Sequence, residues 1–242
     1  TSPVQESRPI STPPPRILVT GATGLVGSHV VESALQRGYR VRALAREGSD
    51  TRLLQQWGVE IVPGDLALPV TLPPAVRHVD VIVHCAAKVG DWGPIDDYRA
   101  VNVRSLEHLL QAAEASPEIP RFIHISSLGV YEGRDHHGTD ETTPPSLTGM
   151  DGYTLTKAEA EQLVLRHIAQ HQLPATILRP GFIYGPRDRT VMPKLLERLQ
   201  RGQVKYFGTG EQLLNNTYVL NLVDAIFLAI DQPSSIGQIY NL

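Results

Sequence analysis

The chain alternates between short apolar runs and segments in which apolar residues recur every three or four positions. The short runs are rich in β-branched residues and predict strands over 16–20, 39–45, 59–62, 79–87, 121–127 and 175–180. The periodic segments predict helices, of which one ends near residue 37 and two others cover about 96–115 and 152–170. Because strands alternate with helices and are apolar along nearly their whole length, we expect a doubly wound α/β fold, with a parallel sheet between two helical layers.

The pattern changes after the sixth strand. A basic helical segment at 192–202 and a short VKYF strand at 204–207 predict a smaller lobe, and the final IYNL again indicates a strand. We therefore expect a disordered proline-rich tail at 1–15, a sheet domain at 16–180, and a partial substrate lobe at 181–242 with segments that return to the sheet domain. This lobe is expected to be incomplete.

Composition narrows the classes of protein that fit this chain. Of its 242 residues 41% are hydrophobic, which is enough for a sizeable core. A net charge of −3 and a pI of about 6.3 argue against a partner that is nucleic acid or an anionic membrane. No apolar run approaches the roughly 20 residues needed to span a bilayer, and no secretory leader precedes the first strand, so we expect a cytoplasmic protein.

Three residues could suggest a disulfide or a metal site. Cys85 is the single cysteine, which excludes an intrachain disulfide, and we expect it to be a small buried hydrophobe. His136 and His137 are adjacent in a polar loop, where histidines are usually solvated. No metal site is therefore expected.

A glycine-rich loop, TGATGLVG, joins the first strand to the first helix. Gly21 permits a tight turn, Gly24 lets backbone N–H groups approach a pyrophosphate, and Gly27 allows close packing of the helix. The spacing is G-x-x-G-x-x-G, and its place at the first strand of an alternating chain predicts dinucleotide binding. Further cofactor contacts are expected from Thr23, Leu25 and Val26.

The end of the second strand bears on which dinucleotide binds. An NAD site usually has an acidic residue there to accept hydrogen bonds from the ribose, but this chain has Ala45 followed by Arg46. A guanidinium suits a 2′-phosphate, with which it forms charge-assisted hydrogen bonds. We therefore favour NADP and keep NAD as the alternative; a solvated Arg46 would leave the preference open.

The stretch YTLTK places Tyr153 and Lys157 on one helix face, four residues apart. A tyrosine with its usual pKa near ~10 is a poor acid–base group at neutral pH, and a nearby cation lowers that pKa. Ser126 and Ser127 end a strand at the sheet edge where ligands bind in this architecture. A serine, a tyrosine and a lysine around one oxygen would provide general acid–base catalysis of hydride transfer.

From residue 16 to the end, the chain resembles the extended short-chain dehydrogenase/reductase family. The resemblance is carried by TGATGLVG, the strand-end serines, YTLTK and RPGFIYGP. The resemblance implies a Rossmann sheet, Tyr153 as the acid–base and Lys157 as a ribose ligand that lowers the tyrosine pKa. It favours Ser127 over Ser126 as the catalytic serine and adds Asn102 as a supporting residue. It implies a homodimer through the helices near 96–115 and 152–170. Further cofactor contacts would come from Asp65, Leu66, Cys85, Ala86, Ala87, Pro180 and Ile183.

The family divides into enzymes of nucleotide sugars and enzymes of apolar alcohols. In the segment RPGFIYGP the enzymes of nucleotide sugars have a pattern similar to R-x-x-N-x-Y-G-P, and this chain has Phe182 in place of the asparagine. An apolar ring cannot replace the hydrogen bonds of that asparagine. NNTYVLNLVDA resembles 3β-hydroxysteroid and sterol dehydrogenases. We expect an apolar sterol- or flavonoid-like alcohol or ketone, contacted by Phe182, Trp92, Ser127 and Tyr153. An NDP-sugar epimerase or dehydratase and a non-catalytic dinucleotide-binding scaffold remain as alternatives.

Overall fold

The central element of the protein is a parallel sheet. The computed structural model describes residues 13–90, 92–148, 151–189, 191–203 and 214–242. Within these ranges seven strands form one sheet in the order β3–β2–β1–β4–β5–β6–β9, and all neighbours run parallel. The strands are β1 (Arg16–Thr20), β2 (Arg40–Ala45), β3 (Glu60–Pro63), β4 (Val81–His84), β5 (Arg121–Ile125), β6 (Ala175–Arg179) and β9 (Ile239–Asn241). The predicted doubly wound α/β fold is confirmed.

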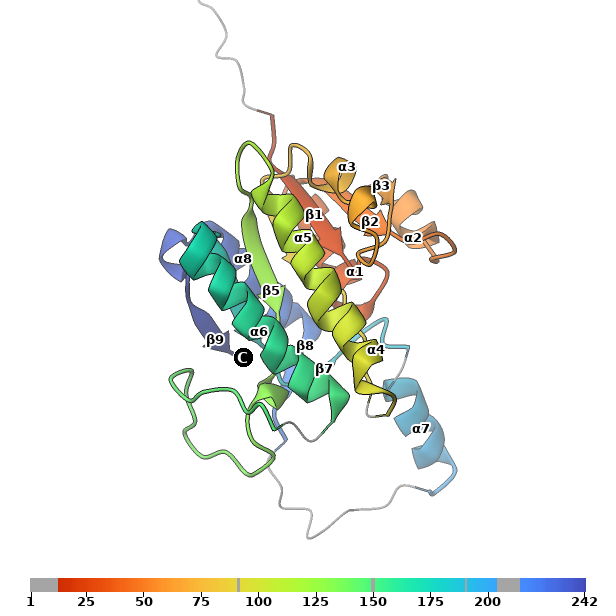
Figure 1. The fold of residues 1–242 in the computed structure, drawn as a ribbon. Coiled ribbons are helices and arrows are strands. Elements are labelled where there is room, and N and C mark those ends of the chain that lie inside the picture. The colour runs from red at the N-terminus through yellow and green to blue at the C-terminus, as the bar shows by residue number, and fades with distance from the viewer. Residues whose placement is uncertain (1–12, 91, 149–150, 190, 204–213) are drawn as a thin grey trace, which may run out of the picture.

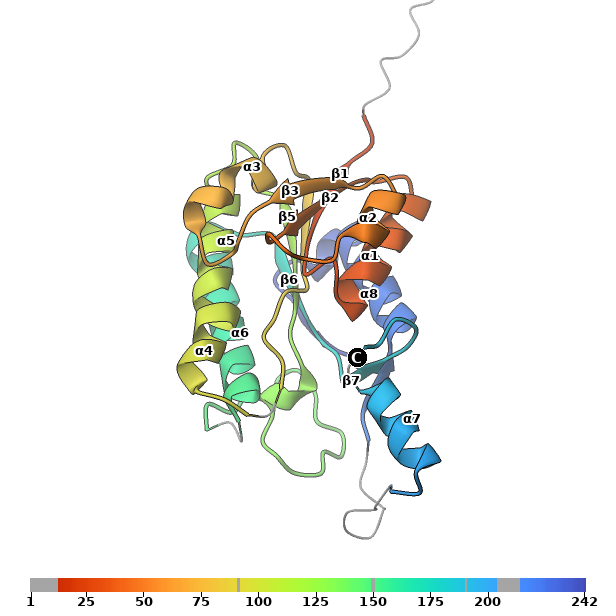
Figure 2. The same ribbon diagram turned by 90° about the vertical axis from the view of Figure 1, so that its right-hand side faces the viewer.

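Helices cover both faces of the sheet (Figure 1). One layer contains α1 (Leu25–Gln36), α2 (Arg52–Gln56) and α8 (Val219–Asp231). The other contains α3 (Pro73–Val76), α4 (Ile95–Arg99), α5 (Ser105–Glu114) and α6 (Gly152–His171), as Figure 2 shows. None of the described helices combines the length and the apolarity required to cross a bilayer.

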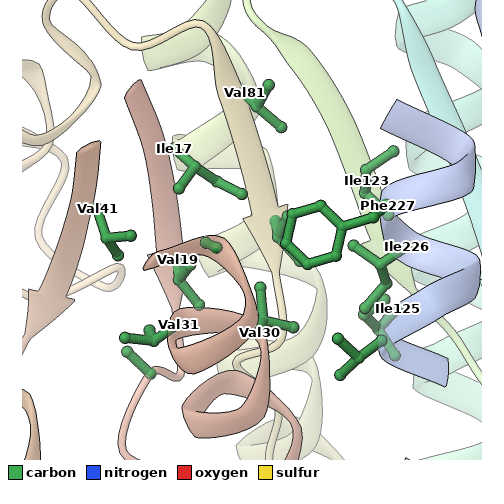
Figure 3. Packing of buried hydrophobic residues seen from close by; sticks show 14 of the residues in the cluster. Ile17, Val19, Val30, Val31, Val41, Val81, Ile123, Ile125, Ile226 and Phe227 are labelled. Carbon is green, nitrogen blue, oxygen red and sulfur yellow. The ribbon is translucent and has the colours of Figure 1, made fainter. Parts of the chain in front are cut away.

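The apolar runs are continuous because alternate strand residues enter different cores. On β1, Ile17 packs against the α1 and α8 layer, whereas Leu18 packs against the α5 and α6 layer. In the first of these cores Val30 of α1 and Phe227 of α8 lie over the sheet (Figure 3). Burying one such side chain contributes roughly 1.5–3 kcal/mol, so both layers are held to the sheet by its two apolar faces.

The helix predicted over 96–115 is continuous but not uniform. Between α4 and α5, residues Ala100–Arg104 form a π-helical segment, which contains the predicted site residue Asn102. A π-helical turn holds one residue more than an α-helical turn would, and such segments are frequent at functional sites. The sequence pattern did not predict this change of helix type.

The C-terminal part of the chain contributes to the main sheet and also forms a small second sheet. Strands β7 (Phe182–Tyr184) and β8 (Asn216–Tyr218) pair in parallel with each other. Helix α8 packs against α1, and β9 extends the main sheet beside β6. Helix α7 (Met192–Gln200) lies beyond β7 and buries none of its residues. The predicted VKYF strand at 204–207 lies outside the described residues.

The N-terminal tail was predicted to be disordered over 1–15. Residues 1–12 lie outside the described ranges. Pro14 and Pro15 accept hydrogen bonds from the side chain and the backbone of Arg40, at 2.9 and 3.0 Å. The end of the tail is therefore fixed beside β2.

Candidate active site

A groove of about 340 Å³ opens at the carboxyl edge of the sheet, beside the loops that follow β1 and β4. The strand order reverses between these two strands, and parallel α/β sheets bind ligands at such a switch point. Predicted cofactor residues that line the groove are Gly21, Thr23, Gly24, Arg46, Asp65, Leu66, Cys85, Ala86 and Ala87. Lining residues that sequence reasoning missed are Thr20, Ala22, Leu44, Ala45, Ser49, Gly64, Ala67, Val101 and Ser105. Most of the missed residues adjoin predicted ones at strand ends, and this position in the sequence could have identified them as lining residues.

The glycine loop packs so closely against its surroundings that a side chain at either of two of its glycines would clash with backbone atoms. Gly21 has a φ of +67°, and a Cβ there would lie 2.8 Å from the backbone nitrogen of Ala86. A Cβ on Gly27 would lie 2.2 Å from the carbonyl oxygen of Gly21. The third glycine therefore allows α1 to pack against the loop itself, whereas the first lets the loop approach the end of β4.

The N-terminus of α1 lies beside the groove, which its capping residue Gly24 lines. Gly24 is the residue that caps the helix, and its extended backbone (ψ 178°) leaves the first-turn N–H groups of Leu25 and Val26 facing out of the helix. Such groups, with the positive end of the helix dipole, bind phosphate anions. Val26 also packs against the core, which fixes the direction of α1.

Arg46 and Asp65 line the groove beyond the ends of β2 and β3. The exposed Arg46 follows β2, and within the described part of the chain its guanidinium has no ion-pair partner. The nearby Arg52, by contrast, forms an ion pair with Asp50 at 2.8 Å. The Asp65 carboxylate accepts a hydrogen bond from the backbone of Ala67 at 2.9 Å. Arg46 is thus a cation that remains available to an anionic ligand.

Ser127 and Tyr153 meet although they lie on different elements. Ser127 follows β5 and accepts a hydrogen bond from the backbone of Gly129 at 3.0 Å. Tyr153 lies in the first turn of α6, which begins with a capping box in which the Asp151 carboxylate accepts from Thr154 N–H at 2.8 Å. Burial raises the pKa of the Tyr153 phenol, and a hydrogen bond with Ser127 acts in the opposite direction.

The side chain of Lys157 is buried. Its Nζ donates a 2.7 Å hydrogen bond to the carbonyl oxygen of Ile125 and lies 5.9 Å from the ring centre of Tyr153. Desolvation lowers the pKa of Lys157 to about 8, although Glu161 and Cys85 act to raise it. The predicted lowering of the Tyr153 pKa by Lys157 is wrong for this structure: burial dominates and Ser127 is the opposing neighbour.

Ser126 and Ser127 follow β5 in an extended conformation, in which adjacent side chains face opposite sides, so the two serines have different partners. The buried Ser126 hydroxyl donates to Glu161 at 2.5 Å. Glu161 also receives two hydrogen bonds from Arg179 of β6, at 2.9 and 2.6 Å. Of the two serines, the geometry therefore places Ser127 beside Tyr153. Glu161 and Arg179 were not predicted; the spacing of Lys157 and Glu161, one helical turn apart, was the available signal.

Asn102 joins the loop after β4 to α6. Its side chain accepts from Lys88 N–H at 2.7 Å, donates to the Lys88 carbonyl oxygen at 3.1 Å, and donates to the Thr156 hydroxyl at 3.0 Å. Thr156 lies between Tyr153 and Lys157 on the helix. Asn102 therefore holds the helix that carries both residues.

Four other predicted residues lie outside the groove lining described above. The Pro180 carbonyl oxygen accepts from Leu128 N–H at 2.9 Å, directly beside Ser127, and Ile183 packs against the α1 and α8 core. Phe182 of β7 is half exposed. Trp92 is 92% exposed, so its ring lies in solvent and does not form a pocket wall in this structure.

Burial raises the pKa of Cys85 to about 12. The thiol is therefore protonated at neutral pH and cannot act as a nucleophile there. Cys85 contributes to the groove as part of the loop after β4, together with Ala86 and Ala87.

The strand order, the glycine cradle and the groove at the switch point define a Rossmann-like α/β protein. The chain belongs to the NAD dependent epimerase/dehydratase family, whose model matches residues 17–242. The resemblance to extended short-chain dehydrogenases/reductases is thereby confirmed.

Similar proteins include both oxidoreductases and a sugar-nucleotide epimerase. The chain is 36% identical over 220 residues to 2-alkyl-3-oxoalkanoate reductase of Stenotrophomonas maltophilia (strain K279a), covering 89% of this chain and 65% of that protein. It is 35% identical over 238 residues to 3 beta-hydroxysteroid dehydrogenase/Delta 5-->4-isomerase of Mycobacterium tuberculosis, covering 93% and 64%. The structure resembles UDP-glucuronic acid 4-epimerase from Bacillus cereus, in complex with UDP-glucuronic acid and NAD, with a TM-score of 0.80, 27% identity and coverage of 93% and 76%. The chain thus spans less than two thirds of the two named reductase and dehydrogenase relatives.

Proposed function

We propose that this chain belongs to an NAD(P)-dependent oxidoreductase that interconverts a secondary alcohol and a ketone on an apolar, sterol- or flavonoid-like substrate. The proposal rests on the hydrogen bond between Ser127 and Tyr153, which lie near the buried Lys157 at the sheet edge where the glycine loop also lies. The names of the reductase and dehydrogenase relatives support the same class of reaction.

Each residue has a defined task in this proposal. A bound nicotinamide would supply or accept the hydride. The Tyr153 hydroxyl gives a proton to the substrate oxygen during reduction and removes one during oxidation. Ser127 donates a hydrogen bond to the same oxygen and so orients the carbonyl. Lys157 holds the strand end through Ile125 and can bind the cofactor ribose, while Asn102 holds α6 in place.

The two serines provide a matched test of this assignment. Tyr153→Phe and Ser127→Ala should each remove most turnover of a ketone panel with NADPH, while binding of NADPH persists. Ser126→Ala should retain turnover, because Ser126 bonds to Glu161 and not to the reacting groups. Retained turnover in Tyr153→Phe would refute the acid–base role, whereas a wild-type protein that binds neither NADPH nor NADH would refute the whole proposal.

We also propose that NADP is preferred to NAD, because the Arg46 guanidinium lines the groove and has no ion-pair partner among the described residues. A hydrogen bond to a charged group contributes about 1.5–3 kcal/mol, which corresponds to roughly 10- to 100-fold in affinity. Arg46→Ala should therefore weaken NADPH binding by that factor and leave NADH binding unchanged. Arg52→Ala is the control, because Asp50 already pairs with that guanidinium.

A nucleotide-sugar epimerase is the second candidate, and the similarity to UDP-glucuronic acid 4-epimerase favours it. The half-exposed Phe182, which stands in place of a polar residue, favours the apolar substrate instead. Stereochemical inversion of a UDP- or GDP-sugar, with no turnover of apolar ketones, would select the epimerase. Binding of NADPH without turnover of either class would support a non-catalytic scaffold.

The assembly that the family resemblance supports is a homodimer through α4, α5 and α6. Gel filtration combined with light scattering tests this proposal, and a monomeric mass at micromolar concentration would refute it.

A further inference from the structure

A cluster of two imidazoles and a carboxylate lies at the opposite end of α6 from Tyr153 and Lys157. Helices α5 and α6 lie side by side and end at the same end of the molecule (Figure 1). Glu114 is the last residue of α5, and His167 and His171 lie in the last two turns of α6. The two histidines are four residues apart, so they occupy one helix face.

The distances within this cluster are those of a carboxylate placed between two rings. Glu114 Oε1 lies 2.5 Å from Nδ1 of His167, and Oε2 lies 3.7 Å from Nδ1 of His171. The rings stack, with centroids 5.2 Å apart. One donor atom from each residue lies within 4.8 Å of the other two. Donor atoms around a tetrahedral Zn²⁺ lie about 3.3 Å apart when each bond is close to 2.0 Å, so small side-chain movements suffice.

The electrostatic surroundings also favour a cation. Two helix C-termini converge here, and each carries a partial negative charge. The ion pairs of Glu114 within the described residues are with these two imidazoles, so no lysine or arginine neutralises the carboxylate. Glu114 and His167 are largely buried, whereas 51% of the His171 side chain is exposed, which leaves a path for an ion from solvent.

We propose that Glu114, His167 and His171 form a binding site for a divalent transition-metal ion of the zinc class. Two nitrogen donors and one carboxylate oxygen match the ligands that Zn²⁺ accepts, with water completing the coordination. The ion takes the place of the hydrogen bond between Glu114 and His167, and it links the ends of α5 and α6. This site was not predicted from the sequence, because Glu114 and His167 are 53 positions apart.

His171→Ala is the decisive variant. The Glu114–His167 hydrogen bond alone already explains contact between the helices, whereas the third ligand is needed only for a metal. His171 is half exposed, so its removal leaves the core intact. His137→Ala is the matched control, because this exposed histidine lies in a loop between β5 and α6.

The experiment is titration of the metal-free full chain with Zn²⁺ by calorimetry, accompanied by Co²⁺ absorption and thermal unfolding. The wild type and His137→Ala should bind one Zn²⁺ per chain, give the visible bands of four-coordinate Co²⁺, and unfold at a higher temperature with metal. In His171→Ala the affinity should fall at least about tenfold and the thermal shift should disappear. Absence of Zn²⁺ binding in the wild type, equal binding in His171→Ala, or loss of binding in His137→Ala would each overturn the proposal.

Discussion

The ion pair between Glu161 and Arg179 gives the sharpest test of the energetics described above. Both side chains are almost fully buried, with exposed fractions of 0% and 1%. Two parallel hydrogen bonds of 2.9 and 2.6 Å join them, and Arg179 also donates to the Tyr131 hydroxyl at 2.6 Å. Replacing Glu161 with Gln keeps the shape of the side chain and removes one charge, which leaves the guanidinium uncompensated in the core.

The expected cost follows from the loss of that compensation. Breaking a buried pair by removing one partner destabilises a protein by about 3–5 kcal/mol. For a chain of this length each kcal/mol lowers the melting temperature by about 2–4 °C, so Glu161→Gln should lower it by roughly 6–20 °C. Glu197→Gln is the control, because the Glu197–Arg201 pair lies on the exposed α7 and contributes only about 0.3–0.5 kcal/mol.

The assay is urea unfolding of both variants at pH 7, followed by circular dichroism. A cost below about 1 kcal/mol for Glu161→Gln, or a cost equal to that of Glu197→Gln, would refute the assignment of an uncompensated charge. The double variant Glu161→Met with Arg179→Met should recover much of the loss, because it removes both charges together. If the double variant is as unstable as Glu161→Gln, the lost hydrogen bonds of Ser126 and Tyr131, and not the uncompensated charge, account for most of the loss in the free energy of unfolding.

Three further predictions concern the groove and its floor. Gly27→Ala should abolish NADPH binding in a fluorescence titration, because its Cβ would lie 2.2 Å from the Gly21 oxygen; Gly38→Ala strains the backbone at a φ of +82° but meets no atom within 4 Å, so it should retain binding. Burial lowers the pKa of Lys157 from 10.5 to about 8, so between these values the unfolded chain holds a proton that the folded chain has lost. Stability relative to Lys157→Met should therefore rise with pH from 8 to 10.5, by at most about 1.4 kcal/mol per pH unit, and a constant difference in urea unfolding would contradict this sign. Because the pKa of Cys85 is raised to about 12, a thiol reagent at pH 8 should modify it about a thousandfold more slowly than in the urea-unfolded chain; equal rates would show that the thiol is ionised.

The sequence was sufficient to predict the layered architecture because its main signals are local. Strand runs, helical periods and the glycine loop each depend on residues within a short window, and the switch point follows from the order of the elements. The family resemblance favoured Ser127 over Ser126, and in the structure Ser127 hydrogen-bonds to Tyr153 whereas Ser126 hydrogen-bonds to Glu161; the catalytic role of Ser127 stays a prediction.

What the sequence could not supply depended on burial and on distant partners. The direction of the Tyr153 pKa shift is set by desolvation, which no four-residue spacing reveals. The indole of Trp92 is in solvent, although its neighbours in the chain suggested a pocket wall. The pairing of Glu161 with Arg179 required the fold to bring α6 and β6 together.

The π-helical segment at Ala100–Arg104 constrains how the length of this chain can change. Because this π-helical turn holds one residue more than an α-helical turn, it can lose one residue and become a regular α-helical turn while α4 and α5 keep their orientations. Tyr98, which is buried and donates to carbonyl oxygens of the preceding loop, and Leu106 in the core would then keep their places. Relatives of this chain should therefore tolerate the loss of one residue between Tyr98 and Leu106, and those that have lost it should lack the contact that Asn102 makes with α6.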